Sequence, residues 1–157
     1  MLLPFFEWCE ASAIGDAIRN SLWLFPAIEC VHLLGLVLLG GSVLIVDLRL
    51  LNLGLRDQAV RAVGASADRL MMAGISLMLV TGIPLFLSEA IKCYYSPAFW
   101  VKILTLVPAL IFALTVRRWV VGADEGRWGS GTRALTAFAS LSSWFTVAAA
   151  GRWIGFS

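Results

Sequence analysis

The sequence has little charge and few side chains that commonly bind metals. Asp, Glu, Lys and Arg make up only 14% of the 157 residues, and the formal net charge is +2. An excess this small does not indicate a nucleic-acid partner. One histidine and three cysteines leave the chain without repeated metal ligands, which disfavours a metal-export component.

Apolar residues dominate instead. They form 60% of the chain, and the mean hydropathy of +0.87 lies outside the range of soluble globular proteins. Each of four apolar stretches has close to the ~20 residues that cross a bilayer as a helix. These stretches are residues 24–47, 70–91, 98–120 and 134–155.

Residues 5–21 are more polar, but their apolar side chains recur at helical spacing. This pattern indicates a short helix lying in the membrane interface. We therefore expect an all-α integral membrane protein with one domain over residues 1–157. Its expected architecture is a four-helix bundle with a short N-terminal interfacial helix.

Arginines gather in two of the links between the expected spans. The link 48–69 carries Arg49, Arg56, Arg61 and Arg69, and the link 117–133 carries Arg117, Arg118, Arg127 and Arg133. The positive-inside rule places both links in the cytoplasm, so both termini are expected on the periplasmic side of a bacterial inner membrane. Asp47 and Arg49, at the inner end of the first span, are interpreted as a solvated pair.

The only histidine lies inside an apolar run. Counting along the helix places His32 about 12 Å inside the outer end of the first span. An ionisable side chain at that depth needs a partner or a function. The other three spans also contribute ionisable groups near the outer end, so we expect a cluster facing the bundle interior. Its members are Glu29, His32, Glu89, Lys102 and Arg152, with Gly35 among the small residues that leave room for a flat ligand.

A purely structural interpretation of the same residues stays open. His32 can be satisfied by a neighbouring helix, and Glu29 can neutralise Lys102. Arg152 can extend to the interface. The three cysteines also map to the outer side, where an oxidising compartment permits a disulfide between Cys9 and Cys93 and leaves Cys30 as a buried thiol.

Two segments carry a family resemblance. VHLLGLVLLGGSVLIVDLRLL, residues 31–51, and AFWVKILTL, residues 98–106, resemble small bacterial four-helix membrane proteins of the copper-resistance D and HemJ-type protoporphyrinogen oxidase group. The resemblance implies that His32 ligates haem b and that Lys102 is functionally important. With one histidine per chain, a bis-histidine haem within a single chain is excluded.

The leading hypothesis is a haem b redox protein that oxidises a hydrophobic substrate such as a porphyrinogen or a quinol. His32 is the expected metal ligand, Lys102 and Arg152 would neutralise haem propionates or an anionic substrate, and Glu29 or Glu89 would handle protons. Its expected surroundings are the lipid bilayer, a membrane redox partner and further copies of the chain. Two alternatives remain: a cofactor-free scaffold or accessory subunit, and a small metal or solute transport component.

Overall fold

The computed structural model describes residues 2–124 and 126–156, and every regular element within them is helical. Two short helices, α1 (Leu3–Glu10) and α2 (Ala13–Arg19), precede the long helices α3 (Leu24–Leu50) and α4 (Val60–Ser88). A short helix α5 (Ala90–Tyr95) leads into α6 (Pro97–Phe112), which continues through a π-helical segment η1 (Ala113–Arg117) into α7 (Arg118–Gly122). The last helix is α8 (Ser130–Ile154).

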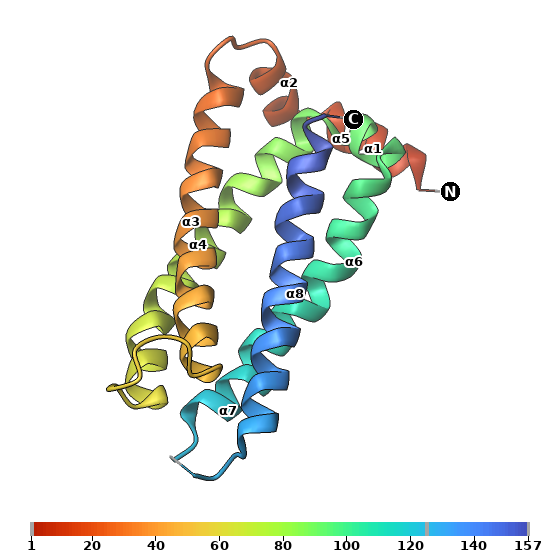
Figure 1. Ribbon diagram of the computed structural model, residues 1–157. Helices are drawn as coiled ribbons and strands as arrows, with labels where there is room; N and C mark the ends of the chain where they lie inside the picture. The colour runs from red at the N-terminus through yellow and green to blue at the C-terminus, as the bar shows by residue number, and fades with distance from the viewer. Residues whose placement is uncertain (1, 125, 157) are drawn as a thin grey trace.

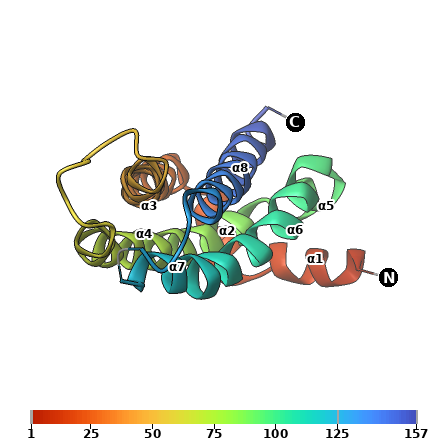
Figure 2. The same ribbon diagram turned by 60° about the horizontal axis from the view of Figure 1, so that its bottom comes forward.

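Within the described residues, four helical segments are long and apolar enough to cross a membrane: α3, α4, the continuous helix 97–122, and α8. α3 packs along α4, α6 packs along α8, and α8 also packs against α3 (Figures 1 and 2). The expected bundle of four apolar helices is therefore confirmed, and the chain has the build of a multi-pass membrane protein. One end of the bundle holds α1, α2, α5 and both termini, and is called the terminal end (Figure 1). The other holds the link 51–59 and the described residues 123–124 and 126–129 of the last link, and is called the arginine end.

The second spanning helix begins earlier than the sequence indicated. It starts at Val60 rather than near residue 70, so the link from α3 shortens to residues 51–59. Arg61, Asp68 and Arg69 lie within the helix, beyond its most apolar part. Hydropathy marks the apolar window, whereas these charged residues are compatible with helix and simply extend it.

The N-terminal segment is two helices rather than one. The side chain of Ser12 accepts a hydrogen bond of 3.2 Å from the backbone N–H of Gly15, which caps α2 after a break at residues 11 and 12. α1 packs against α5 across the terminal end (Figure 2).

All three cysteines are free thiols in the structure. Cys9 and Cys93 are buried in one apolar cluster with Phe6 and Ala90, yet both are free thiols. The disulfide that an oxidising compartment would permit between them is absent from the structure. Cys30, expected to be a buried thiol, is exposed on the surface of α3 instead. The helix was placed correctly, but its rotation about its own axis was not visible in the sequence.

Close contact between α3 and α4 depends on glycines. A Cβ atom added at Gly74 would lie 2.7 Å from the backbone nitrogen of Leu39 and 3.0 Å from the carbonyl oxygen of Gly35. No side chain fits there, so Gly74 allows the two backbones to approach closely. Next to this crossing, an apolar cluster fills the middle of the bundle; it consists of Leu39, Val43, Met71, Ile75, Ala109, Ala113, Trp144 and Val147.

Candidate functional site

His32 lies on α3, half-buried, with its ring against α4. Its Nδ1 atom is 2.8 Å from the hydroxyl oxygen of Thr81, and that hydroxyl donates to the backbone carbonyl of Leu77 at 2.6 Å. Because the single proton of the Thr81 hydroxyl is directed to Leu77, the hydroxyl accepts from His32, and Nδ1 carries the ring hydrogen. In this arrangement the neutral imidazole has its free lone pair on Nε2. Metal-binding histidines are oriented in the same way, by donating the opposite ring N–H.

Gly82 provides the space for this ring. A Cβ atom at residue 82 would lie 3.3 Å from Cε1 of His32, closer than most such contacts in proteins. Thr81 and Gly82 are adjacent on α4, so one residue hydrogen-bonds the imidazole and the next makes room for it. The ring position is therefore defined by two neighbouring residues of the facing helix.

Gly35 does not open a slot for a flat ligand. A Cβ atom there would meet Met78 at 3.2 Å and Leu77 at 3.3 Å, because α4 fills the space beside it. Its position is set by close packing of α3 against α4. The expectation that Gly35 leaves room for a cofactor is wrong for this arrangement of the helices.

Lys102 approaches His32 from a different helix. Its alkyl chain lies against Gly151 of α8, where an added Cβ would be 3.5 Å from Nζ. Its positive charge acts on His32 and on the thiol of Cys93, which places the ammonium among α3, α5 and α8. No carboxylate of the described residues lies within 4.0 Å of it. The structure thus brings the two residues of the sequence motifs into one region. The ion pair between Glu29 and Lys102, which the purely structural interpretation allowed, does not form.

The other expected site residues lie nearer the surface. Glu29 is exposed on α3. Glu89 pairs with Lys92 at 3.7 Å, and each of these side chains is about 40% exposed. Arg152 is exposed, and its guanidinium lies 4.5 Å from the centre of the Phe156 ring. All three lie towards the terminal end, and no hydrogen bond or ion pair among the described residues joins them to His32.

Cys93 lies within electrostatic range of Lys102 on one side and of Glu89 on the other. Burial, reinforced by the nearby Glu89 carboxylate, raises the pKa of its thiol to about 11. The thiol is therefore neutral near physiological pH. A neutral buried thiol is a poor nucleophile and a poor metal ligand.

A second polar cluster, which was not predicted from the sequence, lies at the arginine end of the bundle. Asp47 is fully buried and accepts a 3.1 Å hydrogen bond from Nε of Arg117, whose side chain is only 6% exposed. Arg49, the expected partner of Asp47, instead donates to the backbone carbonyl of Gln58 at 2.6 Å. The interpretation of Asp47 and Arg49 as a solvated pair is therefore wrong.

A helical period in the sequence could have revealed this pair. Leu39, Val43 and Asp47 follow at intervals of four, and all three are buried. Ala109, Ala113 and Arg117 do the same in the helix 97–122. A charged residue that continues a buried apolar row is itself expected to be buried, and two such rows with opposite charges predict an ion pair.

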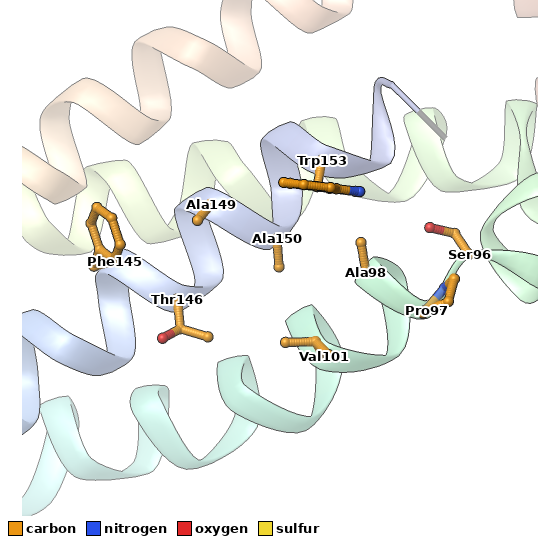
Figure 3. A pocket seen from close by; sticks show the side chains of 9 residues that line it. All are labelled: Ser96, Pro97, Ala98, Val101, Phe145, Thr146, Ala149, Ala150 and Trp153. Atoms are coloured by element: carbon orange, nitrogen blue, oxygen red, sulfur yellow. The ribbon is translucent and has the colours of Figure 1, made fainter.

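Two shallow, largely apolar hollows lie between α6 and α8, with volumes of about 430 and 370 Å³. Figure 3 shows the first, with the ring of Trp153 at its terminal end and Val101 facing α8 across it. The walls are lined by Ser96, Pro97, Ala98, Val101, Phe145, Thr146, Ala149, Ala150 and Trp153. Neither hollow is lined by His32 or Lys102. Among the described residues, no three His, Cys, Asp or Glu side chains are grouped so that they could hold a metal ion.

Comparison with known proteins places nearly the whole chain in one family. Neither the curated proteins nor the solved structures include a match. A model of the family DUF6644, described as a family of unknown function, matches residues 5–157. The chain therefore belongs to the DUF6644 family.

Proposed function

We propose that this protein is a haem b redox protein of the bacterial inner membrane, in which Nε2 of His32 would bind the haem iron. The observation that carries the proposal is the chain of hydrogen bonds from His32 through Thr81 to Leu77. It fixes the tautomer in which Nδ1 carries the ring hydrogen, so the neutral imidazole has its free lone pair on Nε2, the atom that would bind haem iron. When bound, haem b would supply electron exchange with a hydrophobic substrate such as a porphyrinogen or a quinol.

Lys102 is assigned to an anionic group beside His32. Its ammonium lies within electrostatic range of the imidazole and is not paired with any carboxylate of the described residues. A partly buried cation that has no counter-ion among the described residues gains from binding one, and a haem propionate or an anionic substrate would supply it. Arg152 is exposed towards the same end, and proton exchange is assigned to Glu29, which is exposed, and to Glu89, which is about 40% exposed.

The orientation follows from the arginines. Arg56, Arg61, Arg118 and Arg127 lie on or beside the links at one end, and the termini lie at the other (Figure 1). The positive-inside rule assigns the arginine end to the cytoplasm. The region around His32 and Lys102 then belongs to the periplasmic half, as do both termini.

An absorption spectrum tests the haem assignment. The full chain, expressed with adequate haem supply and purified in detergent, is expected to show a Soret band and a reduced-minus-oxidised difference. His32→Ala should lose both, because it removes the ligand. Full haem retention by a folded His32→Ala variant would contradict the assignment.

Thr81→Val tests the hydrogen bond that carries the proposal. It removes the acceptor of the His32 proton with little change in volume, and loss of such a partner typically weakens metal binding ~10–100-fold. Thr146→Val is the matched control, since its hydroxyl also donates to the carbonyl four residues earlier, at 2.8 Å, but has no histidine beside it. Equal haem affinity in the two variants would contradict the assigned role of Thr81.

Lys102→Met tests the cation. We expect it to lower haem retention or activity more than Lys92→Met, because Lys92 is at the surface and already paired with Glu89. The two variants remove the same charge from neighbouring elements. Equal effects would show that the depth of Lys102 has no functional importance.

A cofactor-free membrane subunit is the second candidate. The hollows between α6 and α8 favour it, because small side chains such as Ala98, Ala149 and Ala150 let a partner helix approach closely. A colourless protein that co-purifies with another membrane protein would support this function over the first.

A further inference from the structure

The chain between α4 and α6 changes direction at a single residue. α4 ends at Ser88 and α5 begins at Ala90, so only Glu89 separates them, and its backbone (φ −137°, ψ 38°) lies outside the helical region. α5 leads directly into α6, which begins at Pro97. Lys102 lies in the second turn of α6. The position of Lys102 therefore depends on the angle at which α5 and α6 leave α4.

The N-terminal helices hydrogen-bond to the backbone on both sides of this break. Oε2 of Glu10, at the end of α1, accepts from the backbone N–H of Ile91 in α5 at 2.6 Å. Arg19, at the end of α2, donates to the backbone carbonyl of Ser88 at 3.3 Å. The first N–H groups and the last carbonyls of a helix have no partner within that helix. The N-terminal segment thus supplies partners that the interrupted helix cannot supply for itself.

Phe6 of α1 joins aromatic rings from three further helices. Its side chain is only 5% exposed, and its ring stands edge-on to Phe86 of α4 and Phe99 of α6, with centroids 5.5 and 6.0 Å away. Phe86 and Phe99 stack on each other at 5.6 Å. The Phe6 ring also contacts Tyr94 of α5 at 5.2 Å and Trp100 of α6 at 5.9 Å. Edge-on and offset pairs of this kind have preferred geometries, so the cluster fixes how the helix ends meet.

The aromatic cluster lies next to Lys102 along α6. The indole nitrogen of Trp100 donates to the backbone carbonyl of Tyr94 at 3.0 Å, which ties the first turn of α6 to α5. Lys102 follows Trp100 by two residues, a rise of ~3 Å along the helix axis. Its alkyl chain lies against Gly151 of α8. A displacement of the first turn of α6 would therefore also displace Lys102 relative to α8.

We propose that α1 positions Lys102. Phe6 and Glu10 are four residues apart, on one face of α1, and both act on Lys102 through α5 and the start of α6. They hold α6 at a fixed angle to α4, the helix whose Thr81 hydrogen-bonds His32. α1 thereby keeps the ammonium and the imidazole in one region. The effect of α1 on haem rests on the proposed function, whereas the placement of Lys102 does not.

Carbon-13 NMR tests the placement without haem. Lys92 and Lys102 are the only lysines of the chain, so the full chain labelled with ε-¹³C lysine in lipid nanodiscs gives two signals, which Lys92→Arg assigns. We expect Phe6→Ala to move the Lys102 signal towards that of Lys92. Phe5→Ala is the matched control, because Phe5 is 53% exposed on the same helix, and it should leave the signal in place. An unmoved Lys102 signal in folded Phe6→Ala, or equal movement in both variants, would overturn the proposal.

Two substitutions of Glu10 test the hydrogen bond to Ile91. Glu10→Gln keeps an oxygen that can accept from the Ile91 N–H, whereas Glu10→Met does not. Only Glu10→Met should move the Lys102 signal and raise hydrogen exchange at the Ile91 amide several-fold. Glu7→Met is the matched control, since it removes an exposed carboxylate from the same helix and should change neither measurement. If Phe6→Ala fails to fold, this pair decides, and identical Lys102 signals in Glu10→Gln and Glu10→Met would overturn the proposal.

Haem retention separates a failure of this inference from a failure of the proposed function. In a haem-binding protein, Phe6→Ala should lower haem retention several-fold but cause no further loss when Lys102→Met is already present, because both changes act through one ammonium. Full additional loss would overturn the positioning role and leave the haem assignment standing. A colourless protein whose Lys102 signal moves in Phe6→Ala would refute the haem assignment and still support positioning by α1.

Discussion

Removal of Arg117 should destabilise the bundle more than removal of any surface arginine. The Asp47 carboxylate is fully buried, and the guanidinium of Arg117 is its hydrogen-bonded counter-charge at 3.1 Å. Arg117→Met keeps most of the side-chain volume but leaves this carboxylate uncompensated. Breaking a buried ion pair in this way costs about 3–5 kcal/mol.

A double variant separates the cost of the unpaired Asp47 carboxylate from the cost of lost packing. Asp47→Leu combined with Arg117→Met removes both charges, and replacing a buried pair by apolar residues is often neutral. We therefore expect the double variant to be more stable than Arg117→Met alone. Together with the single variant Asp47→Leu, these proteins give a coupling energy that should be at least about 3 kcal/mol in magnitude, because only the single variants leave a buried charge unpaired.

A matched surface pair provides the control. The next residue, Arg118, pairs with Asp68 of α4 at 2.8 Å, and both side chains are 41% exposed. Arg118→Met should cost less than about 1 kcal/mol, because water and salt screen the exposed pair.

The assay is reversible unfolding in mixed micelles by increasing dodecyl sulfate, followed by helical circular dichroism. Equal destabilisation by Arg117→Met and Arg118→Met would refute the reasoning. A double variant less stable than Arg117→Met would refute it as well, because the stabilising contribution of Asp47 would then not depend on Arg117.

Two further predictions concern helix packing and thiol reactivity. Gly74→Ala should destabilise the bundle by about 1–3 kcal/mol in the same assay, because the added Cβ meets the backbone of Leu39. Gly41→Ala is the control and should leave the stability unchanged, because nothing lies within 4 Å of its added Cβ. Equal losses of stability in the two variants would contradict the close crossing of α3 and α4. At about pH 8 only ~0.1% of Cys93 should be thiolate, so maleimide should modify exposed Cys30 first, and Cys93 should react only as pH rises towards its pKa of about 11. The neutral thiol stabilises the fold below the unfolded pKa of 9.0, and this contribution should be lost as pH rises through 11; early labelling of Cys93 would contradict its burial.

The sequence predicts how far along a helix a side chain lies. It does not predict which neighbouring helix, or which part of the surface, that side chain faces. Counting residues placed His32 and Lys102 at similar depths, and the structure brings them within electrostatic range. The same count placed Glu29 on the face of His32, yet Glu29 is exposed. A rise of 1.5 Å per residue is a fixed property of the helix, but which side faces a neighbour depends on how the helices cross.

The buried ion pair of Asp47 and Arg117, towards the arginine end, is a second case in which the sequence did not predict the direction of a side chain. Asp47 and Arg49 are close in the sequence and carry opposite charges, which favoured a local pair. Residues two apart lie on different sides of a helix, and Asp47 turns inward to Arg117. Arg117 was counted with the arginines of the link 117–133, but a buried carboxylate stabilises it within the bundle.

The sequence by itself determined the class of the protein: four apolar helices, their approximate positions and the accumulation of arginine at one end. These properties are sums over neighbouring residues, and lipid imposes them on each helix separately. Only the tertiary structure decided which side chains meet. The His32–Thr81 hydrogen bond and the Asp47–Arg117 pair depend on the rotation of each helix about its axis. That rotation is set where Gly74 lets α3 and α4 touch, by packing between residues far apart in the chain.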